Sequence, residues 1–237
     1  MILIIIAAAL LPSVLLFFYI QRLDPQPEPT RWLVRALLYG VAICLPVALV
    51  EAGISRVLFG DGPTTLLGTT IEAFLVAAVP EECFKLLALW LVLRHNPYFD
   101  EHFDGIVYAV CVGLGFASLE NVLFVAGEEG NWVGVAISRA LLSVPGHYAF
   151  AVLMGYYYSM YHFVDHSPRI AARILLVPVV GHGIYDAIAL SGTVNPYIGG
   201  ISSFALIYFC IRIHKYARTK IVAQIERDRS DGDILFS

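Results

Sequence analysis

The chain has 237 residues, of which 59% are hydrophobic and only 14% are charged, and its mean hydropathy is +0.75. A typical soluble domain is about 45–50% apolar and about 25% charged, so this composition excludes an ordinary soluble protein and predicts a polytopic membrane protein. The formal net charge of −4, without any basic block, gives no reason to expect nucleic acid as a partner. The length predicts a single domain, residues 1–237.

The predicted elements are all helices. The segment 1–20 is apolar over about the length that spans a bilayer. It lacks a positive n-region and a cleavage site, so we expect a retained first helix rather than a signal peptide. Apolar runs bounded by charged or Gly/Pro-rich stretches give an all-α fold with about seven transmembrane helices, at 1–20, 36–59, 66–93, 105–126, 132–162, 172–190 and 197–214.

The connecting segments differ in charge. Every second connection is rich in Lys and Arg, whereas the segments GDGPTT, GEEGN and SGTVNP contain neither. Positive residues remain in the cytoplasm, so the pattern predicts the N-terminus outside and the C-terminus inside. The expected location is the cytoplasmic (inner) cell membrane, with a solvated cytoplasmic tail over about 215–237.

The helix predicted at 66–93 carries the sequence PEECFK at membrane depth. Glu81 and Lys85 are spaced i,i+4 and share a face, whereas Glu82 is rotated about 100° from Glu81. A charge at the bilayer centre costs roughly 2.5–3.5 kcal/mol on insertion scales, so each group needs a partner or a function. Pro80 predicts a kink or a restart of the helix at Glu81.

The next two helices add a carboxylate, an amide and an imidazole. Glu120 and Asn121 are adjacent in the helix predicted at 105–126, and His147 follows Pro145 and Gly146 in the next helix. We expect this Pro-Gly dipeptide to break the helix, and broken helices at membrane depth usually line a cavity or a binding site.

The helix predicted at 172–190 contains His182 and Asp186 at i,i+4 spacing. A carboxylate in that position can bind one imidazole nitrogen and fix which nitrogen faces the cavity. Each of these groups alone is also compatible with a structural ion pair or hydrogen bond.

Together, the polar groups of four helices predict one buried site that activates water. Two chemistries remain open. The side chains could ligate a divalent metal such as Zn²⁺. Alternatively, a carboxylate could act as general base without metal while imidazoles and an amide polarise a carbonyl.

The ordered motifs resemble those of the PrsW family of intramembrane proteases, within the CPBP superfamily that includes the type II CAAX endopeptidases. They are EExxK from Glu81, FxxxEN from Phe116, His147 with Gly155, and HxxxD from His182, in a core of about 66–190. The resemblance implies hydrolysis of a single-span membrane protein in the bilayer, such as the first (site-1) cleavage of an anti-sigma factor. Glu120 stands where the wider superfamily has a histidine, and Asp186 stands where it has an asparagine.

We therefore expect a membrane-embedded endopeptidase in which Glu81, or else Glu82, activates the water and Lys85 tunes its charge. His147 and His182 would polarise the carbonyl or hold a metal, Asp186 would orient His182, and Asn121 could supply an amide donor. The expected metal ligands are Glu81, Glu120, His147 and His182. A proton-coupled transporter or channel with a buried Glu/His relay is the alternative.

Overall fold

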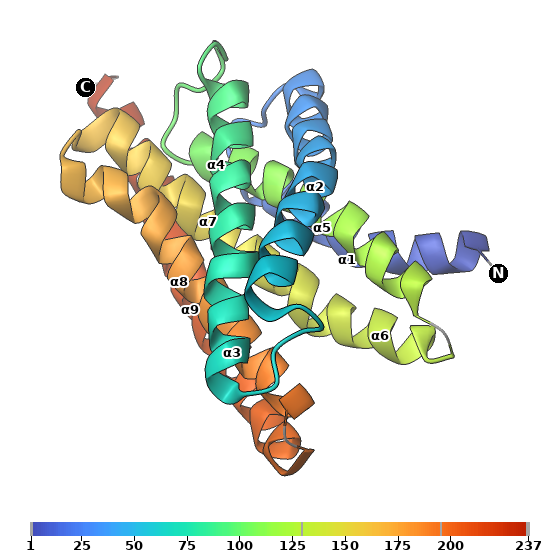
Figure 1. Ribbon diagram of the computed structural model, residues 1–237. Helices are drawn as coiled ribbons and strands as arrows, with labels where there is room; N and C mark the ends of the chain where they lie inside the picture. The colour runs from blue at the N-terminus through green and yellow to red at the C-terminus, as the bar shows by residue number, and fades with distance from the viewer. Residues whose placement is uncertain (1, 129, 195, 236–237) are drawn as a thin grey trace.

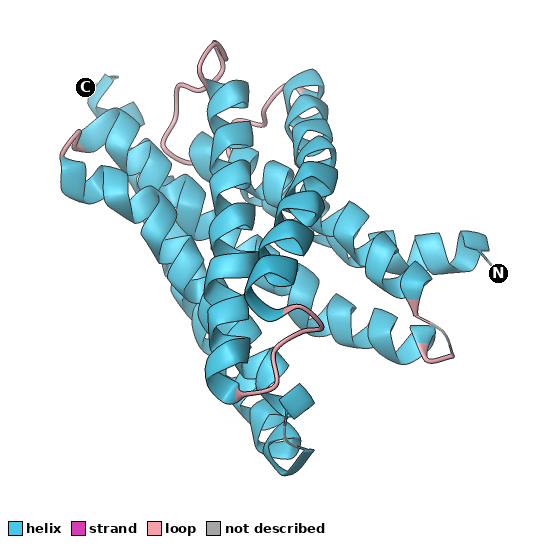
Figure 2. Ribbon diagram, viewed as in Figure 1, coloured by secondary structure: helices cyan, strands magenta, loops and turns pink. Residues whose placement is uncertain are grey.

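The structure is a computed structural model that describes residues 2–128, 130–194 and 196–235. All regular secondary structure in this part of the chain is helical (Figures 1 and 2). The α-helices and the π-helical segments η1–η3 are, in chain order, α1 (Ile2–Leu23), α2 (Thr30–Phe59), α3 (Leu66–Ile71), η1 (Glu72–Ala78), α4 (Val79–Leu93), α5 (Asp104–Gly127), α6 (Trp132–Ser138), η2 (Arg139–Ser143), α7 (Val144–Ser159), η3 (Met160–Val164), α8 (Pro168–Val194) and α9 (Pro196–Leu235).

These elements form seven continuous rods among the described residues, because α3, η1 and α4 join end to end, as do α6, η2, α7 and η3. The rods match the seven predicted segments, although α2 starts six residues earlier than expected. Six of them are long and apolar enough to cross a membrane. The seventh, 66–93, is of sufficient length but contains the charged residues Glu72, Glu81, Glu82 and Lys85.

Helix α5 is the central element. It packs against α1, α2, α4 and α7, and its side chains from Asp104 to Ala117 are all buried. A helix that is apolar on every face is expected at such a position. Burial decreases from Ser118 onward, so Glu120 lies where the core gives way to a cavity.

Glycine allows α5 and α7 to approach closely at Gly155, the glycine eight residues after His147. A Cβ atom at this position would lie 2.3 Å from the backbone oxygen of Gly105. The glycine of the motif therefore sets the distance between two helices that carry site residues.

We expect Gly155→Ala to lower the free energy of unfolding by about 1–3 kcal/mol, because the added methyl group forces two backbones apart. Thermal unfolding in detergent micelles measures the effect. Gly53→Ala is the matched control, since a Cβ atom there meets nothing within 4 Å. Equal unfolding temperatures for the two variants would contradict this account of the α5–α7 contact.

The break predicted at Pro145–Gly146 is corrected by the structure, because the helical rod continues through it. The rod is also continuous at Pro80, where α4 begins at Val79, close to the restart predicted at Glu81. A π-helical segment precedes each proline: η1 ends two residues before Pro80, and η2 ends two residues before Pro145. A proline removes one backbone donor and collides with the preceding turn, and the wider π turn relieves that conflict without ending the helix.

The C-terminal segment is also more ordered than predicted. Helix α9 continues to Leu235, and Ala217, Ile221 and Gln224 are buried, so the segment after 214 is not a fully solvated tail. Its Asp228 carboxylate accepts hydrogen bonds from the backbone N–H groups of His102 (2.7 Å) and Phe103 (2.9 Å), directly before α5.

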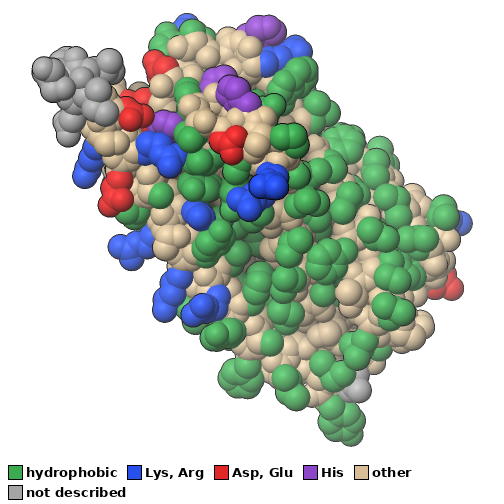
Figure 3. Space-filling model, turned by 90° about the vertical axis from the view of Figure 1, so that its left-hand side faces the viewer, with side chains coloured by type: hydrophobic (Ala, Val, Ile, Leu, Met, Phe, Trp, Pro, Cys, Tyr) green, Lys and Arg blue, Asp and Glu red, His purple; other side chains and the backbone are tan. Residues whose placement is uncertain are grey.

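Charged side chains are unevenly distributed on the molecular surface. On the face shown in Figure 3, Lys and Arg gather toward the end where the C-terminus lies, whereas the rest of that face is mainly hydrophobic. This is the division expected of a protein with one basic loop face and an apolar belt.

Candidate functional site

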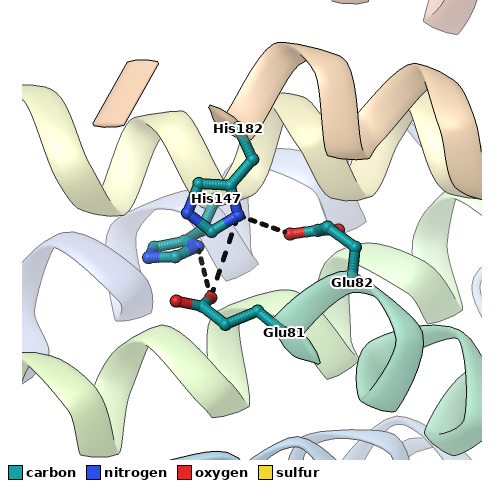
Figure 4. Close-up of side chains that lie close together, drawn as sticks. All are labelled: Glu81, Glu82, His147 and His182. Carbon is teal, nitrogen blue, oxygen red and sulfur yellow. Dashed lines mark hydrogen bonds and ion pairs between the residues drawn. The ribbon is translucent and has the colours of Figure 1, made fainter. Parts of the chain in front are cut away.

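The polar residues predicted on three of the four helices meet in one cluster in the structure. Glu81 and Glu82 of α4, His147 of α7 and His182 of α8 point toward one another (Figure 4). Each offers one ligand atom, and these four atoms lie within 4.8 Å of one another. All four side chains are buried. The site therefore combines residues more than 100 positions apart in the sequence.

Lys85 lies at the centre of this group. Its Nζ donates to Glu81 Oε2 (2.8 Å) and Glu82 Oε1 (2.9 Å), and lies 3.1 Å from His147 Nδ1. It also lies 4.4 Å from the centroid of the Phe116 ring. The ammonium group thus contacts three of the four side chains that form the cluster.

Glu82 also points into the site, although it is rotated about 100° from Glu81 around the helix. Its i,i+3 spacing brings Oε1 to Lys85, and the same oxygen lies 2.9 Å from His182 Nδ1. Glu82 is completely buried, and its Oε2 has no hydrogen-bond partner in the described part of the chain.

The two histidines share one arrangement. In each ring Nδ1 faces the glutamates of α4, and Nε2 faces another carboxylate: Glu120 at 3.0 Å for His147 and Asp186 at 3.2 Å for His182. An Nε2–H donated to a carboxylate leaves the Nδ1 lone pair directed at the cluster. Carboxylate–histidine–metal triads use this arrangement to orient metal ligands.

Aromatic rings hold these imidazoles in place. Phe150 stacks on His182 with a centroid distance of 5.1 Å and an interplanar angle of 18°, and Phe116 meets His147 edge-on at 5.8 Å. The sequence analysis missed Phe150, although its place three residues after His147 on the same helical face could have indicated it.

Glu120 and Asn121 lie beside the cluster rather than within it. Glu120 Oε2 binds both His147 Nε2 and the guanidinium of Arg139. The group of potential metal ligands in the structure therefore contains Glu82 in place of the predicted Glu120. Glu120 instead contacts Nε2 of His147, on the side of the ring that faces away from the cluster. The cause is the i,i+3 geometry of α4, which turns Glu82 inward.

The amide of Asn121 is engaged in structural contacts. Its Nδ2 donates to the backbone oxygen of Ala9 in α1 (2.7 Å), and its Oδ1 accepts from Arg139 Nε (2.8 Å). Arg139 thus binds both Glu120 and Asn121. The contacts of Asn121 thus position Arg139 and give no support to an amide donor for a substrate carbonyl.

A large cavity opens beside the cluster. It has a volume of about 980 Å³ and extends between α2, α8 and α9. The charged and ionisable side chains on its wall are Glu51, Glu72, Glu81, Glu120, Arg139, His147, His182, Tyr185 and Asp186. Glu82 and Lys85 do not line it, so the two adjacent glutamates have different access to water.

The donor set fits a divalent metal ion. Two imidazole nitrogens with one or two carboxylates are ligands typical of catalytic zinc. The four carboxylates of the site, at 81, 82, 120 and 186, face the two cations Lys85 and Arg139, which leaves two negative charges uncompensated when the histidines are neutral. Oε2 of Glu82, which has no hydrogen-bond partner among the described residues, is a further oxygen atom that can ligate a metal.

We expect Asp186→Asn to weaken metal binding or activity about 10–100-fold, because an amide holds the His182 ring without the charge that makes it a strong ligand. The affinity for Zn²⁺, measured by competition with a chelating dye, tests this. Asp61→Asn, in an exposed loop, is the control. Unchanged Zn²⁺ affinity in Asp186→Asn would show that the His182–Asp186 contact is only structural.

The sequence is similar to known proteins along most of its length. Residues 28–213 match the family model described as PrsW family intramembrane metalloprotease. The chain is 34% identical to Protease PrsW of Geobacillus kaustophilus, over 94% of this chain and 97% of that protein. It is 33% identical to Protease PrsW of Bacillus subtilis, over 93% and 99% of the two chains, respectively. No solved structure gives a significant match.

Proposed function

Because the chain belongs to the PrsW family of intramembrane metalloproteases, we propose that it hydrolyses a peptide bond of a membrane-anchored protein at the wall of the cavity described above. The family makes it a membrane-embedded hydrolase. The observation that carries the proposal is the convergence of two histidine Nδ1 atoms and two carboxylates in a buried site beside that cavity.

Glu81 is the proposed general base. Its carboxylate lines the cavity and lies 3.9 Å from the Nδ1 atom of each histidine, whereas Glu82 has no exposed surface. A water molecule in the cavity can give its proton to Glu81 and attack the carbonyl carbon. The same proton then passes to the nitrogen of the leaving amine as the C–N bond breaks.

The metal ligands that we propose are His147, His182 and Glu82, with Glu81 close enough to share the site. A bound zinc ion supplies a Lewis acid and lowers the pKa of its water. The protein holds both imidazoles in the ligating orientation through Glu120 and Asp186. Lys85 supplies the positive charge that offsets the two adjacent glutamates of α4.

The proposed substrate is a single-span membrane protein such as an anti-sigma factor, cut at site 1 in regulated proteolysis. The size of the cavity supports a peptide substrate, since about 980 Å³ is at the upper end of ordinary ligand pockets. We also propose a cytoplasmic-membrane location with the N-terminus outside. The order of the motifs supports a wider relation to the CPBP superfamily.

The test is cleavage of a labelled single-span substrate in proteoliposomes. His147→Ala and His182→Ala are each expected to abolish cleavage while the helical circular dichroism spectrum is retained. Treatment with a chelator should abolish it as well, and Zn²⁺ should restore it. If both histidine variants cleave normally, the assignment of His147 and His182 to the active site is wrong. If wild type cleaves nothing and the liposomes instead show proton uptake that needs His147, the relay alternative holds.

A further inference from the structure

A second group of carboxylates lies at the loop end of the molecule, remote from the cavity. Glu28 belongs to the linker between α1 and α2, Asp100 to the loop between α4 and α5, and Asp104 is the first residue of α5. One oxygen atom of each lies within 4.8 Å of the other two. Asp104 precedes Glu120 by sixteen residues of one helix, a distance of about 24 Å along its axis.

Asp104 is fully buried, and only half of its carboxylate is satisfied. Oδ2 accepts hydrogen bonds from the backbone N–H groups of Asp100 (3.1 Å) and Glu101 (2.7 Å). Oδ1 has no hydrogen-bond partner in the described part of the chain. A buried carboxylate oxygen without a donor is costly, so this atom indicates a missing positive partner.

Glu28 is a second buried carboxylate of this group. The hydroxyl of Tyr108 donates to its Oε2. In the described ranges, no Lys or Arg lies within ion-pair distance of Glu28, Asp100 or Asp104.

Neighbouring acids increase the negative charge around this group. Asp24, Glu101 and Asp228 are the neighbouring acids. Glu28, Asp100 and Asp104, which no Lys or Arg of the described residues neutralises, require either shared protons or a bound cation.

We propose that Glu28, Asp100 and Asp104 bind a hard divalent cation, with Ca²⁺ as the ligand that fits best. Three carboxylates on separate segments provide an all-oxygen site, which suits Ca²⁺ or Mg²⁺ and disfavours zinc. Ca²⁺ tolerates irregular geometry better than Mg²⁺, and this site combines two loops with a helix terminus. The ion ties the α1–α2 linker and the α4–α5 loop to the start of the central helix.

The experiment uses the full chain in detergent micelles after removal of metal with a chelator. We expect Ca²⁺ to raise the unfolding temperature saturably by several degrees, and Mg²⁺ to do so less. Asp100→Asn should weaken Ca²⁺ binding at least tenfold. Asp100 is exposed, so this substitution removes a ligand without disturbing the core, whereas Glu28→Gln tests a buried one.

Two controls isolate the site. Glu226→Gln removes an exposed carboxylate of α9 and should keep the full response to Ca²⁺. His147→Ala and His182→Ala disable the cluster in the membrane and should keep it too. Tb³⁺ luminescence, sensitised by the nearby Tyr108 ring, should likewise be lost in Asp100→Asn.

The proposal is overturned if Ca²⁺ leaves the unfolding temperature unchanged, or shifts wild type and Asp100→Asn equally. It is also overturned if lower pH alone stabilises this end and Ca²⁺ adds nothing, since the occupant is then a proton shared between Glu28 and Asp104. None of these readouts depends on proteolysis, so the test is separate from that of the proposed function.

Discussion

Glu81→Gln is expected to reduce the rate of cleavage about 10²–10⁴-fold while leaving the protein folded. This range is the usual contribution of a general base, and glutamine cannot accept the proton of water. Glutamine retains the size of the side chain and an oxygen that can still face Lys85. Single-turnover cleavage in proteoliposomes, together with thermal unfolding in micelles, measures the two quantities separately.

The same substitution at the neighbouring residue, Glu82→Gln, is expected to have a different effect. Glu82 is fully buried, and its Oε1 lies within hydrogen-bonding distance of Lys85 and His182, so removing its charge disturbs a closed network. We expect this variant to lose stability, by about 3–5 kcal/mol, as well as activity. If Glu82→Gln is stable and inactive while Glu81→Gln remains active, the roles of the two carboxylates are reversed.

Lys85→Met is expected to make the stability of the protein dependent on metal. The ammonium contacts Glu81, Glu82 and His147, and no other Lys or Arg within the described residues pairs with either glutamate. Its removal leaves two buried carboxylates without a counter-charge. We expect a loss of about 3–5 kcal/mol in chelator-treated protein, and recovery of most of it with Zn²⁺.

Thermal unfolding with and without Zn²⁺ checks this, and Lys215→Met, which removes an exposed lysine of α9, is the control. Wild type should gain less from Zn²⁺ than Lys85→Met, because its own ammonium competes for the same donors. If Lys85→Met is destabilised and Zn²⁺ gives no recovery, the cluster works without metal and the general-base mechanism is favoured.

The helical rods could be predicted because the length of an apolar run is a local property of the sequence. The rod 66–93 has the predicted bounds, and Glu81, Lys85, His147, His182 and Asp186 do converge. Their spacing within each helix fixes a face, and the high cost of burying charge requires those faces to meet.

The side-chain contacts between helices could not be predicted from the sequence. Arg139 pairs with Glu120 because η2 turns its side chain inward, and no pattern of residues announces a π-helical segment. The sequence does not predict that Glu28, Asp100 and Asp104 meet, since only the tertiary fold joins segments so far apart.

The length of α9 has a consequence for how this protein is handled. The same rod contributes Ser202 and Leu206 to the cavity wall. About 39 Å further along its axis from Ser202, its Asp228 accepts hydrogen bonds from the two backbone N–H groups directly before α5. Chains trimmed near residue 215 for crystallisation therefore lose a brace on the helix that bears Glu120. Affinity tags are better separated from Leu235 by a flexible spacer than fused directly to this end.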